Sequence, residues 1–189
     1  MSTSSNQVSA DTTTTDTATS TDTTVVDHPL AENVRPLSPT RGLLISHIIE
    51  LYSCKPTREK FRFYNEDALF EDPVMIAPGL ENIKAQFYAM PKIFSKSTPD
   101  SYKVLKNDEH IIEIDLNQRY FVALFNKEIV HHSFIRLELD TNEKIVKHTD
   151  LWNGKPLYHE GIIGGISSFF RRTNARLVST FVRIPEIAM

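Results

Sequence analysis

The spacing of hydrophobic residues changes once along this chain, near residue 100. Between residues 39 and 95, apolar residues recur every three or four positions, which is the spacing of one face of an α-helix. From residue 101 they alternate with polar residues, as in strands that bury one side. The pattern therefore predicts helices followed by a series of β-strands, which is an α+β arrangement.

Helix signals are clearest at the start of the first part. Ser38-Pro39 is typical of an N-cap followed by the first helical position. A break at the Pro56 position and another at Pro78-Gly79 separate the periodic stretches. We expect three helices and one strand here: a helix over 39–54, a short helix from Pro56, a strand over 69–75 after a turn at 65–67, and a helix over 80–95.

The second part predicts an antiparallel meander. Short polar turns, rich in Asn and Asp, separate its alternating stretches. The expected strands are 102–106, 110–115, 119–125, 129–139 and 144–152. A curved antiparallel sheet wrapped by three N-terminal helices forms a cone, and the mouth of a cone is a natural site for a small molecule.

The two ends of the chain differ from the middle. Residues 2–24 are almost entirely Ser, Thr, Asp and Ala, so we expect a disordered tail over 1–34, followed by one domain over 35–155. Residues 156–189 have apolar positions at helical spacing together with four arginines, which predicts an amphipathic C-terminal helix. Such a helix either lies on an anionic membrane surface or packs on the domain or a partner subunit, and we favour packing.

Composition narrows the class of protein. The net charge of −3 gives no sign of nucleic-acid binding. The single cysteine, Cys54, excludes an internal disulfide and fits a reducing compartment. The sequence shows neither a signal-peptide pattern nor an apolar run long enough to span a bilayer, so we expect a cytoplasmic protein.

Two predicted strands contain a carboxylate among apolar residues. Asp72 follows Ala68-Leu69-Phe70-Glu71, and Asp150 lies in Lys144–Trp152 with His148 and Trp152 two positions away on either side. A buried ionised aspartate is costly unless it is hydrogen-bonded, paired or next to a wet cavity. Because side chains alternate along a strand, His148, Asp150 and Trp152 share one face, and we expect this face to line a pocket.

These segments resemble the nuclear transport factor 2-like superfamily, over roughly residues 38–153. Glu71-Asp72-Pro73, followed by Gly79-Leu80, is similar to the entry to the third helix in that superfamily. The strand Lys144–Trp152 is similar to the "K-I-V-x-H-x-D-x-W" strand of its SnoaL-like branch, which includes polyketide cyclases. The resemblance implies the same cone-shaped fold.

The resemblance also implies roles for individual residues. In ketosteroid isomerases with this fold, the aspartate that matches Asp72 is the general base, and a tyrosine of the first helix completes the oxyanion hole. The matching position here is near Ile48, and Tyr52 lies one turn later. In SnoaL-like cyclases the aspartate that matches Asp150 serves as acid or base, with a nearby histidine for which His131 and His132 are the candidates.

Each of these residues also has a structural interpretation. Asp72 is either a general base or a turn residue that bonds the backbone before Pro73. His148 and Asp150 are either an acid–base pair or a hydrogen-bonded anchor of the sheet. His131 and His132 are adjacent, so they point to opposite faces and at most one enters the pocket.

Two hypotheses on function follow. The first is a cofactor-free isomerase, cyclase or dehydratase that acts on a small, largely apolar ligand through Asp150, His148 and Asp72. The second is a non-catalytic binding or dimerisation module. In both, Trp152, His132, His131, Tyr52 and Phe87 line the pocket, the protein is a homodimer, and no metal or cofactor is expected because the sequence has no ligand cluster.

Overall fold

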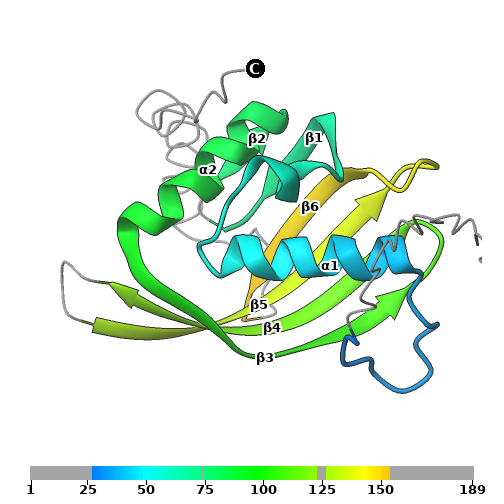
Figure 1. Cartoon of the computed structure of the whole chain (residues 1–189), viewed down its shortest axis with the longest axis horizontal. Coiled ribbons are helices and arrows are strands. Elements are labelled where there is room, and N and C mark those ends of the chain that lie inside the picture. The colour runs from blue at the N-terminus through cyan, green and yellow to red at the C-terminus, as the bar shows by residue number, and fades with distance from the viewer. Residues whose placement is uncertain (1–26, 74, 123–126, 154–189) are drawn as a thin grey trace, which may run out of the picture.

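The computed structural model describes residues 27–73, 75–122 and 127–153. Figure 1 shows a strongly curved sheet with helix α1 lying across it and helix α2 next to strands β1 and β2. The elements in chain order are α1 (Pro39–Tyr52), the 3-10 helix η1 (Arg58–Phe61), β1 (Tyr64–Glu71), β2 (Ile76–Pro78), α2 (Leu80–Ile93), β3 (Phe94–Asn107), β4 (Ile111–Val122), β5 (Lys127–Leu139) and β6 (Ile145–Trp152). The α+β class is confirmed.

Helix α1 begins where the sequence predicts. Ser38 is the N-cap, and its Oγ accepts a hydrogen bond from the Arg41 amide at 3.2 Å, while Pro39 occupies the first turn. The helix presents its apolar side chains to the sheet, and Leu44, Ile45 and Leu51 are fully buried there. A helix capped at its start and buried along one side is held in place by packing rather than by intrinsic propensity.

Of the three predicted N-terminal helices, the second does not form as an α-helix, so this prediction is wrong. Of the segment that starts at Pro56, only Arg58–Phe61 is helical, as one short 3-10 turn. The chain is already extended at Tyr64, where β1 begins, so too few residues remain for an α-helix. The turn predicted at 65–67 is instead an irregular stretch within β1, which changes register between Tyr64 and Leu69.

The sheet is mixed rather than purely antiparallel, which corrects a second expectation. Its strand order is β2-β1-β6-β5-β4-β3, and β1 pairs in parallel with β6 while every other pair is antiparallel. Pairing between the first long strand and the last one cannot be read from local alternation, because it joins segments about 75 residues apart in the sequence. This pairing brings the two predicted carboxylate strands side by side.

Strand β1 also ends earlier than predicted, at Glu71. Proline has no amide proton to donate to a sheet, which explains why pairing stops before Pro73. Strands 110–115 and 119–125 of the prediction form one continuous strand, β4, over Ile111–Val122. Along β4 every second residue is buried, so the alternation simply continues through Asn117-Gln118.

A β-bulge in β6 sets which side chains face the core. Leu139 is opposite Ile145 and Glu138 is opposite Lys147, so one residue of β5 corresponds to two of β6. Ile145 and His148 are both fully buried, whereas Val146 is 37% exposed. Val146 therefore does not share the inner face with His148, because the bulge interrupts the alternation between them.

The chain before Arg35 packs on the sheet where the structure describes it. Leu30 forms a bridge with Val104 of β3, and His28 is buried with its ring bonded to the Tyr102 hydroxyl and the Gly42 carbonyl. The predicted C-terminal helix over 156–189 lies outside the described residues. The division at residues 34 and 155 stays a prediction.

Candidate active site

A chain of four side chains crosses the interior between helix α1 and strands β1 and β6. The Tyr64 hydroxyl lies 2.7 Å from His148 Nδ1, and the Tyr52 hydroxyl lies 3.2 Å from His148 Nε2. The Tyr52 hydroxyl also donates to Asp150 Oδ2 at 3.0 Å. All four residues are buried, with exposed fractions of 4% or less.

The position of each proton follows from the geometry. Burial lowers the pKa of His148 to about 3, so its ring is neutral near pH 7 and carries one proton. Burial and the charge of Asp150 raise the pKa of Tyr52, so its hydroxyl stays protonated. This hydroxyl donates its hydrogen to the carboxylate of Asp150. His148 Nε2–H then donates to Tyr52 Oη, and Nδ1 accepts from Tyr64. In this arrangement each of the three hydrogen bonds that join the four side chains has one donor and one acceptor.

Asp150 has an unusual carboxyl group. Burial raises its pKa to about 6, although contacts with Ser133, Tyr52 and Trp152 oppose the increase. The Trp152 indole Nε1–H donates to the same oxygen as Tyr52, Oδ2, at 3.3 Å. One carboxylate oxygen therefore accepts hydrogen bonds from two donors.

The other oxygen, Asp150 Oδ1, is buried and has no hydrogen-bond partner among the described residues. The same is true of Ser133 Oγ, Gln118 Oε1 and His131 Nε2. The Ser133 hydroxyl is close enough to Asp150 to lower its pKa, but it makes no hydrogen bond of normal geometry. Buried polar groups are nearly always paired, so several unpaired atoms in one region indicate a place where a polar group of another molecule fits.

Aromatic rings pack around the hydrogen-bonded side chains of Tyr52 and His148. Phe87 of α2 lies 5.8 Å from Tyr52 and 6.3 Å from His148 between ring centroids, and Phe70 of β1 lies 4.9 Å from His148. His131 meets Trp152 edge to face at 4.8 Å. The structure thus brings Asp150, His148, Tyr52, Phe87, Trp152 and His131 to one side of the sheet.

His132 lies on the other side. Its inner-face neighbour Ser133 is buried, so alternation turns His132 outward, where Nε2 pairs with Asp115. The expectation that His132 lines the pocket is therefore wrong. His131 takes the inner position, as only one of the two histidines can.

Asp72 forms the turn that follows β1. Its amide donates to the Met75 carbonyl at 3.1 Å, and its Oδ1 accepts from the Met75 amide at 2.7 Å. Asp72 is buried, and it comes directly after Glu71, which is opposite Thr149 in the parallel pair β1–β6. The turn interpretation of Asp72 describes these contacts, and its role in catalysis stays a prediction.

The sequence did not indicate three of the residues that shape this site. Tyr64 and Ser133 are not among the residues that the sequence predicted to line the pocket. Gln118 lies between two of the predicted strands, 110–115 and 119–125. A signal for Gln118 does exist, since it continues the buried series Ile112, Ile114 and Leu116 at intervals of two.

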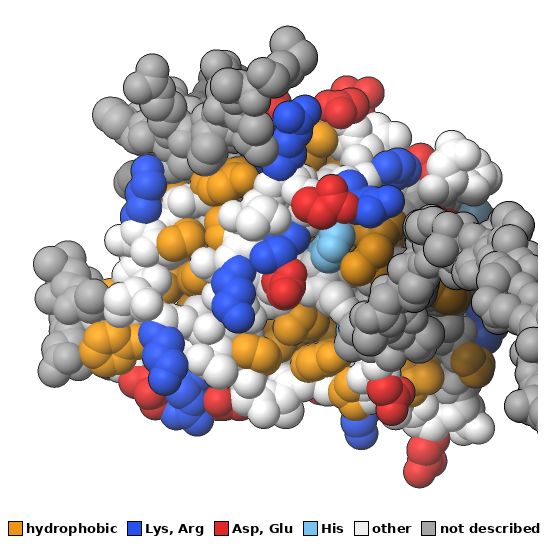
Figure 2. Space-filling view, in the orientation of Figure 1, with side chains coloured by type: hydrophobic (Ala, Val, Ile, Leu, Met, Phe, Trp, Pro, Cys, Tyr) orange, Lys and Arg blue, Asp and Glu red, His pale blue; other side chains and the backbone are white. Residues whose placement is uncertain are grey.

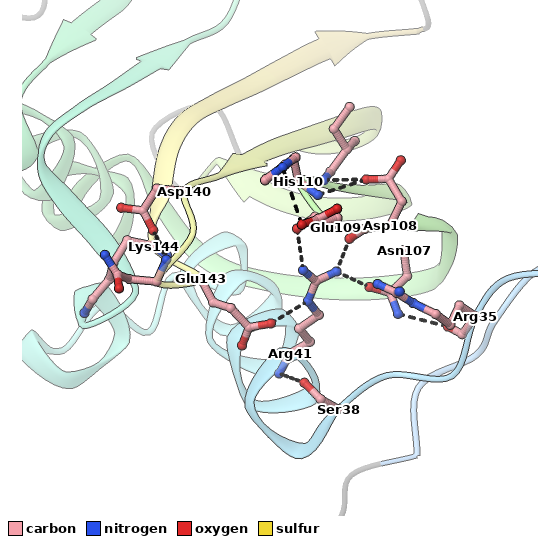
Figure 3. Close-up of polar contacts among 12 residues, drawn as sticks. Arg35, Ser38, Arg41, Asn107, Asp108, Glu109, His110, Asp140, Glu143 and Lys144 are labelled. Carbon is pink, nitrogen blue, oxygen red and sulfur yellow. Dashed lines mark hydrogen bonds and ion pairs between the residues drawn. The ribbon is translucent and has the colours of Figure 1, made fainter.

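A hollow lies at the start of helix α1, away from Asp150. It has a volume of about 360 Å³ and lies between the start of the helix and the β3–β4 and β5–β6 hairpins. Figure 3 shows the Arg41 guanidinium donating to Glu143, to the Asn107 side chain and to the carbonyls of Asp108 and Glu109. Every nitrogen of this guanidinium has a partner, so Arg41 joins three segments and is not available to a ligand.

On the face seen in Figure 2, hydrophobic side chains occur in several separate groups among charges of both signs. Among the residues that the structure describes, no three His, Cys, Asp or Glu side chains gather as a metal site. No helix in the described part of the chain is long and apolar enough to cross a membrane.

Comparison with known proteins identifies the fold. No protein-family model matches the chain, and no curated protein is significantly similar to it. Among solved structures, an NTF2-like protein from Anabaena variabilis aligns with 59% of this chain and 85% of its own, with a TM-score of 0.52 and 12% identity. An NTF2-like protein of unknown function from Exiguobacterium covers 59% of this chain and 99% of its own, with a TM-score of 0.48 and 12% identity.

A protein of the SnoaL-like family from Agrobacterium tumefaciens covers 59% of this chain and 95% of its own, with a TM-score of 0.44 and 13% identity. Identities this low say nothing about substrates or activity, because one fold supports many functions. The structure of the Anabaena variabilis protein, with a TM-score of 0.52, does agree with the resemblance seen in the sequence. This chain therefore has the fold of the nuclear transport factor 2-like proteins.

Proposed function

We propose that the inner side of the curved sheet binds a small, largely apolar molecule and that Asp150 accepts a proton from it. The reaction class is a cofactor-free isomerisation, cyclisation or dehydration. One observation carries this proposal: Asp150 Oδ1 is buried and unpartnered among the described residues, while Oδ2 is fixed by Tyr52 and Trp152. A base needs one free oxygen held at a defined position, and this carboxyl has that arrangement.

The pKa of Asp150 supports the same role. With a pKa of about 6, the carboxyl is mostly ionised at pH 7 and binds a proton more tightly than an ordinary aspartate. A general base works best when its pKa lies near the working pH. Burial among aromatic rings supplies this increase without a second carboxylate in contact.

His148 acts as a positioning residue in this proposal and not as an acid or base. Both of its ring nitrogens are engaged by tyrosine hydroxyls, and its pKa of about 3 keeps it neutral. By accepting from Tyr64 and donating to Tyr52, it orients the Tyr52 hydroxyl toward Asp150. Asp72 remains the candidate for a second carboxylate, since it follows β1 beside the strand that carries Asp150.

Native mass spectrometry of the full chain tests the binding step, because a co-purifying small molecule adds its mass to the protein. That molecule is then incubated with the protein in D₂O, and deuterium uptake at carbon is followed by NMR. We expect Asp150→Asn to retain binding and to lose at least about 100-fold in exchange rate, the usual contribution of a positioned base. Asp115→Asn, which removes a carboxylate from the outer face, is the matched control. Equal exchange by wild type and Asp150→Asn would exclude the catalytic role.

A second candidate is a non-catalytic binding module. The observation in its favour is that the Tyr64–His148–Tyr52–Asp150 chain also ties α1 to β1 and β6, so it has a structural use without any reaction. This candidate predicts binding without deuterium uptake in every variant. Homodimerisation and a cytoplasmic location stay predictions, and light scattering of the full chain checks the first.

A further inference from the structure

Two of the unpartnered polar atoms belong to residues that are directly opposite each other in the sheet. Gln118 of β4 is paired with His131 of β5, and both side chains lie on the inner face. Directly opposite residues have Cβ atoms about 4.5–5.5 Å apart, so the two side chains are immediate neighbours. Gln118 Oε1 and His131 Nε2 are both buried, yet neither bonds to the other or to any other described residue.

The orientation of the Gln118 amide is fixed by its surroundings. Its Nε2 donates to the Tyr52 carbonyl at 3.3 Å and to Ser97 Oγ at 2.7 Å. A carbonyl can only accept, and the Ser97 hydroxyl already donates its proton to the same Tyr52 carbonyl at 2.7 Å. The nitrogen must therefore face these two groups. Gln118 Oε1 is thus turned away from Ser97 of β3, the neighbour of β4 on the side opposite to His131.

His131 complements this acceptor. Burial and the neighbouring His132 lower the pKa of His131, so its ring is neutral near pH 7 and carries one N–H. Gln118 Oε1 can only accept, whereas His131 Nε2 is a donor when it holds the ring proton. The Tyr120 hydroxyl stays protonated because burial raises its pKa, but it bonds to neither atom. An acceptor and a donor that do not reach each other are both satisfied by a bridging group that donates and accepts at once.

Aromatic rings lie beside this pair, and Asp150 lies apart from it. The His131 ring meets Trp152 edge to face at 4.8 Å and lies 6.4 Å from the Tyr120 ring, between centroids. Asp150 is opposite Ile135, four residues from His131 along β5. The pair is therefore a second polar position on the inner face, with apolar surface next to it.

We propose that Gln118 Oε1 and His131 Nε2 together bind a hydroxyl group of the ligand, which donates to the first and accepts from the second. The ligand class is a small, largely apolar alcohol or phenol. A ketone or an ether accepts from His131 but leaves the buried Gln118 oxygen unpaired. Sites that hydrogen-bond a ligand group reject analogues that lack it more strongly than apolar pockets reject a missing methylene. This inference deepens the proposed function by naming the polar group of the ligand, and it rests on that function only for the presence of a ligand.

Cyclohexanol and cyclohexanone provide a direct test, because the two rings have the same size and differ in the donor. Each is titrated into the full chain near pH 7, and the His131 ring nitrogens and the Trp152 indole are followed by ¹H–¹⁵N NMR. Trp152 is the only tryptophan, and its ring contacts His131. We expect cyclohexanol to bind at least about tenfold more tightly, the factor expected when a buried acceptor is paired rather than left without a partner.

Two variants separate the roles of the pair. Gln118→Met keeps the length of the side chain and removes the acceptor, so it should bring the two affinities within about twofold of each other. His131→Phe keeps a flat ring and removes the donor to both probes, so it should weaken both and preserve their ratio. Asn117 and His132 are directly opposite each other on the outer face of the same two strands. The matched controls Asn117→Leu and His132→Phe should therefore leave both affinities unchanged.

Equal affinities in the unaltered chain, or tighter binding of the ketone, would overturn hydroxyl recognition. If neither probe moves the His131 and Trp152 signals, water alone bridges the two atoms and the inference fails. Neither result decides the proton transfer by Asp150, which the deuterium-exchange experiment tests separately. The comparison in the unaltered chain holds even where a variant does not fold.

Discussion

Replacing Asp150 with asparagine should stabilise the protein above pH 6 and not at pH 4. The pKa of this carboxyl is about 6 in the folded protein against 3.8 for an ordinary aspartate. At 1.36 kcal/mol for each pH unit, this difference amounts to about 3 kcal/mol. Asparagine has nearly the same shape and accepts from Tyr52 and Trp152, yet it carries no charge to bury.

The direction with pH follows from proton binding. Between about pH 4 and pH 6 the unfolded chain releases the Asp150 proton while the folded protein still holds it. The folded state then binds more protons, so the free energy of unfolding falls as pH rises through this range. Above pH 6 the full cost of about 3 kcal/mol is present, and below pH 4 it disappears because both states are protonated.

Urea denaturation followed by Trp152 fluorescence, at steps from about pH 4 to pH 8, measures this effect. The difference in unfolding free energy between Asp150→Asn and wild type should grow with pH by up to about 3 kcal/mol and level off above pH 6. Asp115→Asn removes an outer-face carboxylate that pairs with His132 and should change stability by less than about 1 kcal/mol. A difference that does not change with pH would refute the argument that burial raises the pKa of Asp150.

Three further substitutions test other parts of the structure, each by urea denaturation. Tyr64→Phe leaves His148 Nδ1 buried without its donor and should cost about 1–3 kcal/mol; no loss would show that this hydrogen bond is unimportant. Arg41→Lys removes the planar group that joins three segments and should cost about 3 kcal/mol, whereas Arg62→Lys at an exposed pair should cost less than about 1 kcal/mol. Gly79→Ala places a side chain at a φ of 81°, and although its Cβ would have room, strain should cost about 1 kcal/mol.

Local signals in the sequence were sufficient for the parts of the fold that local physics determines. Ser38-Pro39 marked the start of α1 because capping and the proline preference act within four residues. Alternation placed His148 and Asp150 on one face, and the structure buries both.

Features that depend on contacts between distant segments could not be predicted from the sequence. The parallel pairing of β1 with β6 needs two segments far apart in the chain, and their separate patterns contain no information about each other. Tyr64 contacts His148 only because β1 lies beside β6, and Gln118 contacts Tyr52 only because β4 meets the end of α1. The segment after Pro56 forms only a short 3-10 turn because few residues remain before β1 begins.

The bulge at Val146 adds one residue to a strand whose side chains otherwise alternate between the two faces of the sheet. Deleting Val146 would restore strict alternation from Ile145 onward, with Lys147 taking the outward position that Val146 leaves. If Ile145 held its place in the core, His148 and Asp150 would become inward by plain alternation and the site would survive. If the pairing of β6 slipped by one residue instead, Lys147 and Thr149 would turn inward and the two polar side chains would face water. The effect of deleting Val146 therefore depends on whether Ile145 keeps its buried position. If it does, the site is retained, and if it does not, His148 and Asp150 become exposed to solvent.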